Sequence, residues 1–404
     1  MEKLKVAFCG CGNRGTWLSK TAISTGEFEV VAVCDPLFDR AEKLADTLNE
    51  MQGSKPLAFA DYDEMFDKAK PYCVVIACSW EDHVKIAVNA MKRGILVGME
   101  VGGAYNEQEC WDLVNAYEET KTPFMFLENV CFNKEELLAT NMIRKGKLGT
   151  IMYCTGTYGH DLRDEIAGGV TSHHYRLRNY MNRNCENYPT HELGPIAKIL
   201  NINRGNRFTT LVSRSSKAVS MHEYINENLD KYEAIKDAEF KQGDVFTTMI
   251  TTENGELIDI KLDTTTPRIA CRDTMFVGTK GRFVCNDYMV LEDGKFSIFH
   301  ADYKDYIENA KQYEEEFMPK MWKDVTKEIL DAGHGGMDYF ELVEWAKAMK
   351  EGKEMPCDVY DAAAWMCITY LSEISINENR IVEIPDFTRG KYKTRPQRDV
   401  IDFE

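Results

Sequence analysis

The chain has 404 residues, of which 44% are hydrophobic and 28% are charged, so it is long enough for two domains with ordinary cores. Its formal net charge of -17 repels phosphate backbones and anionic lipids, which argues against nucleic acid and membrane surfaces as partners and favours a small molecule. We expect a cytoplasmic protein, because no leader precedes the first strand and the thirteen cysteines lie mostly singly in apolar runs.

Residues 1–128 alternate short apolar runs with amphipathic stretches, which predicts parallel strands joined by helices. Helices are expected near 38–50 and 81–93. The expected strands are KVAFCG, FEVVAVCD, PLAFAD, CVVIAC, ILVGME and PFMFLEN. The fold class of this part is therefore α/β, with an N-terminal doubly wound parallel sheet of the Rossmann type.

Three glycines with the spacing G-x-G-x-x-G, namely Gly10, Gly12 and Gly15, lie between the first strand and the first helix. Such a loop lets the backbone approach a pyrophosphate and directs the helix N-terminus at it. Asp35 follows about 20 residues later, where a carboxylate binds both ribose hydroxyls and repels a 2′-phosphate. The sequence therefore predicts NAD in preference to NADP, with Arg40 nearby moderating that preference.

Trp80 and His83 follow the fourth strand, at the carboxyl edge where ligands of such sheets bind. His83 is expected either near the nicotinamide or, with equal weight, as a helix-start residue that only caps or packs. Glu100 ends the fifth strand. The complete predicted cofactor-binding set is Gly10, Gly12, Asn13, Arg14, Gly15, Asp35, Trp80, His83 and Glu100.

After Asn133 the pattern changes to a helix, a polar and aromatic segment from about 161 to 190, and β-rich runs joined by short turns. These runs, which end with YMVLED, predict a C-terminal α+β domain with a largely antiparallel open sheet. Two further helices are expected near 337–351 and 357–376. The expected organisation is 1–128 for NAD binding, 129–384 for substrate binding and oligomerisation, and 385–404 as a C-terminal tail.

With these features the chain resembles the glucose–fructose oxidoreductase, inositol dehydrogenase and MocA (Gfo/Idh/MocA) superfamily, whose members lay a sugar over the nicotinamide. In its dehydrogenases the fifth strand ends in Glu-Lys-Pro, and the lysine assists removal of the hydroxyl proton. Here Glu100 is followed by Val101 and Gly102, so the usual proton-handling lysine is missing.

The second half resembles one branch more closely, the NAD-dependent glycosidases typified by α-N-acetylgalactosaminidase. The matching stretches are FLENVCF, YGHDLR, NYPTHELGPIAKILNINRG, LDTTTPR, GTKG and GHGGMD. The resemblance implies redox-neutral hydrolysis of N-acetylgalactosaminides or related glycosides: oxidation at C3, loss of the C2 proton, departure of the aglycone, addition of water and return of the hydride. This cycle does not need the two flanking carboxylates of a conventional glycosidase.

On that resemblance Tyr188 and His191 of the YPTH run are the expected proton carriers, and Tyr158 is a further catalytic candidate. A tyrosine can serve if a neighbouring positive charge lowers its pKa. For three candidates a structural role stays open: His191 as a helix cap, Glu128 as a buried hydrogen-bond acceptor and His334 as part of a glycine-flanked loop. The expected substrate-binding set is Glu128, Tyr158, Tyr188, His191 and His334.

Two departures from the sequence pattern of the branch leave the identity of the substrate's sugar undetermined. Ala270 stands where the branch's glycosidases tend to have a tyrosine that contacts sugar. In SHHYRLR, Arg176 and Arg178 either meet an anionic group or belong to a solvated polar loop, the interpretation that we favour. His173 and His174 cannot readily share one tetrahedral metal, and no metal site is predicted.

Three functions compete: a redox-neutral glycosidase, a sugar or inositol dehydrogenase that releases NADH, and a noncatalytic NAD-bound sugar sensor or assembly protein. The missing lysine argues against the second, and the intact Tyr188–His191 pair argues against the third. Members of the superfamily commonly pair through their open sheets, so a homo-oligomer is expected by analogy.

Overall fold

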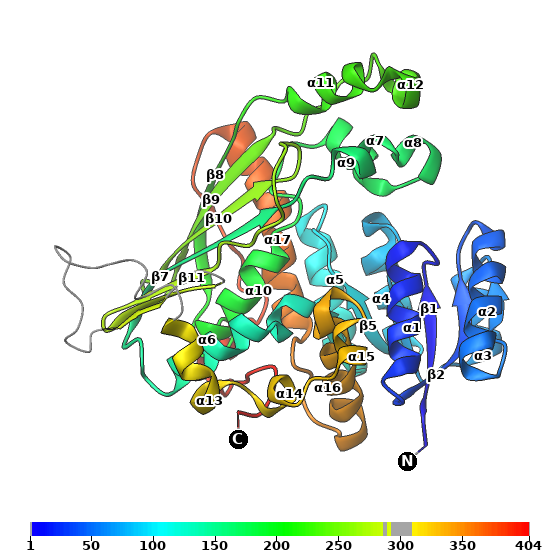
Figure 1. The fold of residues 1–404 in the computed structure, drawn as a ribbon, viewed down its shortest axis with the longest axis horizontal. Coiled ribbons are helices and arrows are strands. Elements are labelled where there is room, and N and C mark those ends of the chain that lie inside the picture. Colours follow the sequence, from blue (N-terminus) through cyan, green and yellow to red (C-terminus); the bar gives the residue numbers. More distant parts are fainter. Residues whose placement is uncertain (1, 286–288, 292–308, 404) are drawn as a thin grey trace.

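A computed structural model describes residues 2–285, 289–291 and 309–403 of the protein (Figure 1). Its N-terminal part is a parallel sheet with the strand order β3-β2-β1-β4-β5-β6, which confirms the Rossmann-type prediction. The strands are β1 (Leu4–Cys9), β2 (Phe28–Cys34), β3 (Leu57–Phe59), β4 (Cys73–Ile76), β5 (Leu96–Glu100) and β6 (Phe124–Leu127). The connecting helices are α1 (Asn13–Ser24), α2 (Phe38–Gln52), α3 (Tyr62–Ala69), α4 (Trp80–Lys92) and α5 (Glu107–Thr120).

Local sequence explains where several of these helices begin and end. The side chain of Asp61 caps α3 by accepting the N–H of Glu64, and Asn106 caps α5 in the same way. α2 ends at Gly53, whose φ of 76° is the left-handed conformation that glycine adopts without steric cost.

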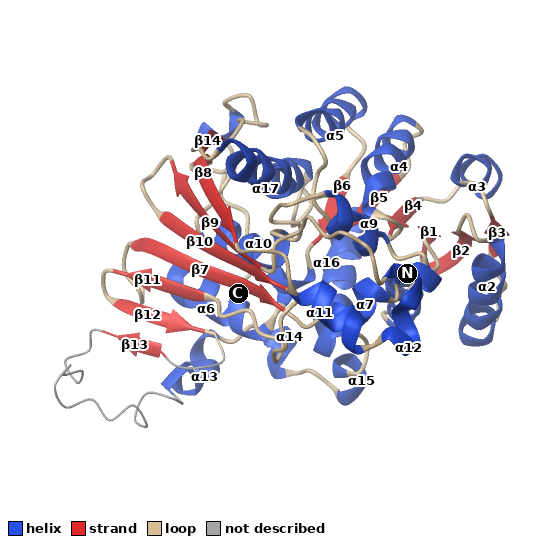
Figure 2. Cartoon of the chain, turned by 90° about the horizontal axis from the view of Figure 1, so that it is seen from above, coloured by secondary structure: helices blue, strands red, loops and turns tan. Residues whose placement is uncertain are grey.

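The second sheet has the strand order β13-β12-β11-β7-β10-β9-β8-β14 (Figure 2). β7 and β10 pair in parallel and the other neighbours are antiparallel, so the prediction of a largely antiparallel sheet is confirmed. The strands are β7 (Ile151–Gly159), β8 (Phe208–Ser215), β9 (Val245–Thr252), β10 (Leu257–Asp263), β11 (Met275–Gly278), β12 (Gly281–Val284), β13 (Met289–Leu291) and β14 (Val382–Glu383). The expected strand YMVLED lies partly outside the described residues.

Helices α10 and α17 lie against one face of this sheet (Figures 1 and 2). The longer helices of this part are α6 (Lys134–Arg144), α9 (Tyr175–Asn182), α10 (Thr190–Ile199), α11 (Ser220–Glu227), α16 (Met337–Glu351) and α17 (Val359–Glu378). The shorter ones are α7 (Arg163–Ala167), α8 (Gly169–Ser172), α12 (Leu229–Tyr232), α13 (Glu314–Phe317), α14 (Lys320–Lys323), α15 (Lys327–Leu330) and the 3-10 turns η1 (Asn129–Phe132), η2 (Glu233–Ile235), η4 (Asn309–Tyr313), η5 (His334–Gly336) and η6 (Lys391–Lys393). α16 and α17 confirm the two late helices.

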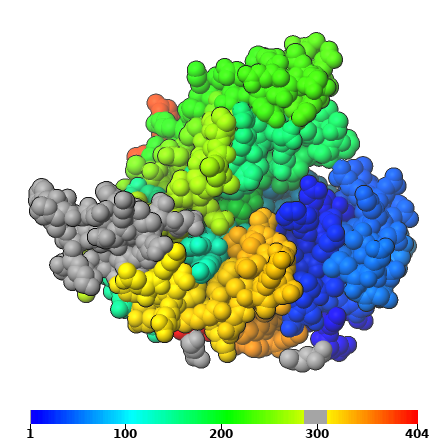
Figure 3. Space-filling model, in the orientation of Figure 1, coloured from blue at the N-terminus to red at the C-terminus, as the bar shows by residue number. Residues whose placement is uncertain are grey.

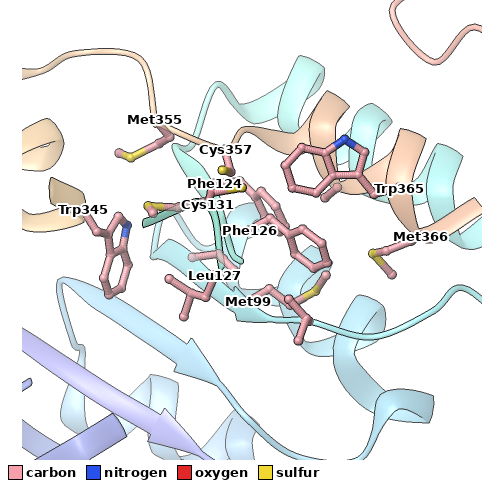
Figure 4. Close-up of a cluster of buried hydrophobic side chains, with 14 of the residues drawn as sticks. Met99, Phe124, Phe126, Leu127, Cys131, Trp345, Met355, Cys357, Trp365 and Met366 are labelled. Carbon is pink, nitrogen blue, oxygen red and sulfur yellow. The ribbon is translucent and has the colours of Figure 1, made fainter. Parts of the chain in front are cut away.

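Helix α17 joins the two sheets into one core. It begins with a capping box made by Asp358 and Asp361, is buried along most of its length, and contacts α5 and β6 on one side and β8 on the other. A helix that is apolar all round fits such an interior position. Figure 4 shows the side chains where β5, β6 and α17 meet, among them Met99, Phe124, Phe126, Leu127, Trp365 and Met366.

The chain's last segment, 385–403, packs back onto the rest of the molecule. Phe387, Tyr392 and Ile401 are buried in it. Arg395 forms an ion pair with Asp358 at the start of α17. The domain limits at 128 and 384 stay predictions, because the core is continuous across the first of them.

Candidate active site

The loop between β1 and α1 fits a pyrophosphate. Gly10 has a φ of +98°, and a Cβ there would lie 2.5 Å from the carbonyl oxygen of Ala77. A Cβ on Gly15 would lie 1.8 Å from the carbonyl oxygen of Gly10. Gly12 differs: among the described residues, no atom outside its immediate chain neighbours lies within 4 Å of its Cβ position, and no side chain caps the first turn of α1. Open space before an uncapped helix N-terminus is what the phosphates of NAD require.

Asp35 follows β2 and is buried. Its carboxylate accepts the N–H groups of Cys11 and Leu37, each at 2.9 Å, which ties it to the glycine loop. A carboxylate has lone pairs left for two ribose hydroxyls. Arg40, the residue expected to moderate cofactor preference, donates instead to the carbonyl oxygen of Ser172 at 2.9 Å and so contacts the second half of the chain.

Arg14 lies on the first turn of α1 and is surrounded by acids. Its guanidinium is 2.7 Å from Glu100 and 2.6 Å from Asp338, and its Nη1 lies 3.0 Å from Nδ1 of His334. Asp338 also accepts the side-chain amide of Asn129 at 2.7 Å. Burial raises the pKa of Asp338, but Arg14 and His334 outweigh it and hold that pKa well below its usual range.

Three residues predicted to contact ligands, Arg14, Glu100 and His334, are thus bonded in one ion-pair cluster. The cluster joins α1, the end of β5 and the start of α16. Asp338 is not among the predicted site residues, although it ends the matching stretch GHGGMD. His334 keeps 42% of its side chain exposed, so it alone of the acidic and basic members has a large free surface.

Glu128, His191 and Tyr188 form a line of hydrogen-bonding groups. Glu128 follows β6 and is fully buried, and its Oε1 lies 2.7 Å from Nδ1 of His191 on the first turn of α10. On the other side of the ring, Nε2 lies 3.5 Å from the hydroxyl of Tyr188. Because a carboxylate only accepts, Nδ1 carries a proton and Nε2 of the neutral ring presents its lone pair toward Tyr188.

Aromatic rings surround this line. The ring centroids of Tyr158 and Tyr188 are 4.5 Å apart, and those of Tyr158 and His191 are 5.5 Å apart. Trp80 stacks on Tyr188 at 5.6 Å. The guanidinium of Arg176 lies 5.1 Å from the Trp80 ring and 4.9 Å from the Tyr188 ring. The structure therefore brings together the three candidate catalytic residues, with Trp80 beside them.

Both tyrosines are held in the protonated form. Burial raises the pKa of Tyr158 to about 12, and Arg176 opposes this effect only in part. Burial also raises the pKa of Tyr188, with a contribution from Tyr158 that again exceeds the lowering by Arg176. The neighbouring cation that a basic tyrosine would need is present, yet by itself it leaves both phenols as proton donors.

His83 packs inside the first half. Its ring is buried, and Nε2 lies 3.1 Å from the carbonyl oxygen of Cys78. Burial lowers its pKa to about 4, so the ring is neutral. At the position of the absent lysine, Val101 is buried, and a Cβ on Gly102 would lie 2.7 Å from the indole of Trp80.

The segment predicted as a solvated polar loop is helical, and for Arg176 that prediction is wrong. Arg176 is only 6% exposed, and its Nε lies 2.9 Å from Glu165. The ring of Tyr175 packs against that of Trp80 in a tilted arrangement, with the centroids 4.5 Å apart, so the segment lies on the first half of the chain. Figure 3 shows the surface hollowed where α7–α9 approach α1. The sequence predicted a solvated loop because the SHHYRLR run is charged and has no apolar periodicity that would indicate a buried helix face.

In the part of the chain that the structure describes, no helix is long and apolar enough to cross a membrane. Within the same residues, no three side chains of His, Cys, Asp or Glu are placed to hold a metal ion. The thirteen cysteines are free thiols.

Comparisons with known proteins agree with this arrangement. Residues 4–127 match the oxidoreductase family with an NAD-binding Rossmann fold, and residues 132–394 match the C-terminal domain of glycosyl hydrolase 109. The α-N-acetylgalactosaminidase of Tannerella forsythia is 33% identical over 413 residues, covering 96% of this chain and 87% of the relative. A glycosyl hydrolase family 109 protein of Stenotrophomonas maltophilia is 34% identical over 420 residues, covering 98% and 91%.

Among solved structures, levoglucosan dehydrogenase in complex with NADH and levoglucosan aligns with a TM-score of 0.71 at 17% identity, covering 95% of this chain and all of that one. An NAD-binding oxidoreductase from Klebsiella pneumoniae aligns with a TM-score of 0.69 at 14% identity, covering 95% and 99%. At such identities the likeness shows the fold alone. With the family match over both halves, the chain belongs to glycosyl hydrolase family 109 and is an NAD-dependent glycosidase.

Proposed function

We propose that the protein hydrolyses N-acetylgalactosaminides by a redox-neutral route in which the Glu128–His191–Tyr188 line moves the protons. The single observation that carries this proposal is the 2.7 Å contact between Glu128 and Nδ1 of His191, with Tyr188 beyond Nε2. The substrate class rests on the name of the Tannerella forsythia relative.

Glu128 fixes the histidine for proton transfer. It holds the proton on Nδ1, so Nε2 is the nitrogen that accepts and returns a proton within one turnover. The full burial of Glu128 keeps water from competing for that hydrogen bond. Glu128 is therefore a positioning residue here, and not a direct sugar contact.

Bound NAD supplies the hydride acceptor for C3 of the sugar. His191, through Tyr188 or directly, takes the proton of the hydroxyl that is oxidised. Tyr158 is held protonated and stands next to both; it donates its proton to the leaving oxygen and takes up the C2 proton in its place, so that its own charge is unchanged. The cation of Arg176 lies over the Tyr188 ring and stabilises negative charge that develops on the phenols or on the sugar oxygens.

The test is incubation of the purified protein with a panel of aryl glycosides, without added cofactor. We expect release of aglycone from the α-N-acetylgalactosaminide over many turnovers, with no lasting change in nicotinamide absorbance. In D₂O the sugar product should carry deuterium at C2. Accumulation of reduced nicotinamide in proportion to product would instead identify a dehydrogenase. Turnover that leaves no deuterium at C2, in the wild type and in every variant tested, would count against the elimination route.

We also propose that the protein works in the cytoplasm as a homo-oligomer formed through the eight-stranded sheet. The sheet carries exposed apolar side chains, Met152 on β7 and Met249 on β9, which are 47% and 42% exposed. Light scattering of the wild type and of Met249→Lys tests the assembly: the proposal requires an oligomer that the lysine weakens, and a monomeric wild type would contradict it.

A further inference from the structure

Buried carboxyl groups flank the YPTH run on both sides. Glu186 precedes the run and Glu192 follows it, and both are fully buried, as is Glu128. Neither oxygen of Glu186, neither oxygen of Glu192, and not Oε2 of Glu128 has a hydrogen-bond partner among the described residues. The proposed proton carriers thus lie among three buried acids, of which the proposed mechanism uses only Glu128.

The backbone holds both groups in place. The N–H of Glu186 donates to Oγ of Ser372 on α17 at 2.9 Å. Glu192 lies on the first turn of α10 and packs against β7. A Cβ on Gly156 of that strand would lie 2.7 Å from the Cβ of Glu192. Tyr158 is two residues further along the same strand, on the same face of the sheet. Glu192 is therefore coupled to Tyr158 through β7.

Among the described residues, no cation pairs with these acids. Arg176 is engaged over the rings of Trp80 and Tyr188, and Arg183 pairs with Glu373 at 2.7 Å. The other titratable groups that face the pair bring no positive charge; they are Tyr158, Tyr180, Cys185, Tyr188 and Glu128. A buried carboxylate that no cation compensates is strongly disfavoured even where a backbone N–H lies near it, so the protonated form is the stable one.

The shifts follow the same physics. Burial raises the pKa of Glu186 to about 8, against a lowering by the backbone N–H of Tyr188. Burial raises the pKa of Glu192 well above its usual range, and the charges of Glu186 and Glu128 add to that effect.

We propose that Glu186 and Glu192 are positioning residues that stay neutral while the enzyme works, and that their ionisation at alkaline pH stops proton transfer at the site. An ionised Glu192 raises the pKa of Tyr158 and so opposes release of its proton. It also adds a second negative charge beside Glu128. The inference rests on the proposed role of Tyr158 as a proton carrier, but the neutrality of the pair does not.

The first test is the pH dependence of kcat for wild type, Glu186→Gln and the double variant Glu186→Gln, Glu192→Gln. Glutamine copies the shape of the neutral acid, so activity at neutral pH should stay within about threefold of wild type. The wild type should lose activity above about pH 8, and Glu186→Gln should move that loss upward by at least about one pH unit. An active Glu186→Gln enzyme with an unmoved alkaline limb would overturn the proposal.

The second test reads protonation without turnover. Infrared spectra of the wild type at neutral pH should contain the carbonyl band of a protonated carboxyl, reduced in each single variant and further in the double one. Glu136→Gln is the matched control for kinetics, because Glu136 is a buried acid on α6 with its own partners, Asn133 and Thr274, and should leave the alkaline limb in place. Spectra in which the Glu186 and Glu192 variants match the wild type would show that both groups are ionised and would sink the idea, whether or not the glycoside is turned over.

Discussion

Two clusters of buried acids, one around Arg14 and one around the YPTH run, differ in how the cost of burying a carboxyl group is met. Around Arg14, the carboxylates of Glu100 and Asp338 are paired with a guanidinium at 2.7 and 2.6 Å. Around the YPTH run, no cation pairs with Glu186 or Glu192 among the described residues, and only backbone N–H groups oppose the effect of burial on their pKa values. Both sets are buried, so burial alone does not decide the charge state.

The charge state of each buried acid depends on whether a cation lies beside it. Arg14 outweighs desolvation and holds the pKa of Asp338 low, whereas burial unopposed by a cation raises the pKa of Glu192. The first cluster is a permanent charge pair that fixes the nucleotide helix α1 to α16. The second holds protons next to residues that must exchange them, and a fixed charge there would oppose that exchange.

The largest expected effect comes from removing His191, the proposed proton carrier between Glu128 and Tyr188. His191→Ala should lower turnover by about a hundredfold to ten-thousandfold, the usual worth of a positioned acid or base, while NAD stays bound. The turnover of Tyr188→Phe should fall by a similar factor. A nitrophenyl leaving group should rescue loss of an acid but not loss of a base.

The matched control is His222→Ala, because His222 is an exposed histidine on α11. Its turnover should equal that of the wild type. Near-normal activity of His191→Ala on natural and activated glycosides alike would show that the histidine is a helix cap, and the proton chemistry would then belong to Tyr158 or His334.

Breaking the compensated cluster should cost folding stability. Arg14→Met leaves Asp338 and Glu100 buried without their cation, which typically costs about 3–5 kcal/mol. Urea unfolding measures this. Arg380→Met removes an exposed pair with Glu378 and should cost less than about 1 kcal/mol. Equal small losses in both variants would mean that the Arg14 pairs contribute nothing.

The two clusters should also give opposite slopes of stability against pH. The low pKa of Asp338 adds stability that is present above about pH 4, the unfolded value, and is lost as pH falls through the folded value. The raised pKa of Glu186 does the reverse: stability falls as pH rises from about 4.3, the unfolded value, to about 8.

The measurement is unfolding free energy against pH for wild type, Asp338→Asn and Glu186→Gln. Asp338→Asn should be less stable than the wild type at neutral pH, and this difference in unfolding free energy should disappear in acid. Glu186→Gln should become more stable relative to the wild type as the pH rises from 5 to about 8. Parallel curves for all three proteins would show that the charge states assigned to the clusters are wrong.

The smallest expected effect concerns a third buried acid, compensated by backbone N–H groups alone. Asp35→Ala should weaken NAD binding by about tenfold, equal to about 1.4 kcal/mol, and should narrow the preference over NADP. Calorimetric titration of nucleotide-free protein with both cofactors measures this. Asp39→Ala, on the exposed side of α2, is the control and should bind as the wild type does.

The sequence determined what depends on neighbours along the chain. The alternation of apolar runs and amphipathic stretches predicted the Rossmann sheet, and the glycine spacing with Asp35 predicted NAD. The YPTH run carried the resemblance to the glycosidases and singled out Tyr188 and His191. Each of these signals lies within one strand–turn–helix unit or one short motif, where periodicity and spacing translate directly into backbone geometry.

Only the tertiary structure decided which partner each of these side chains meets. Glu128 reaches His191 across 63 residues, and Arg14 reaches Asp338 across 324. Arg176 is buried because α9 packs on Trp80, which its polar sequence context did not indicate. The contacts of Glu128 and Asp338 follow from how α10 and α16 pack against η1, the turn directly after β6. That packing determines whether a buried acid has a cation beside it and keeps its charge or has none and keeps its proton.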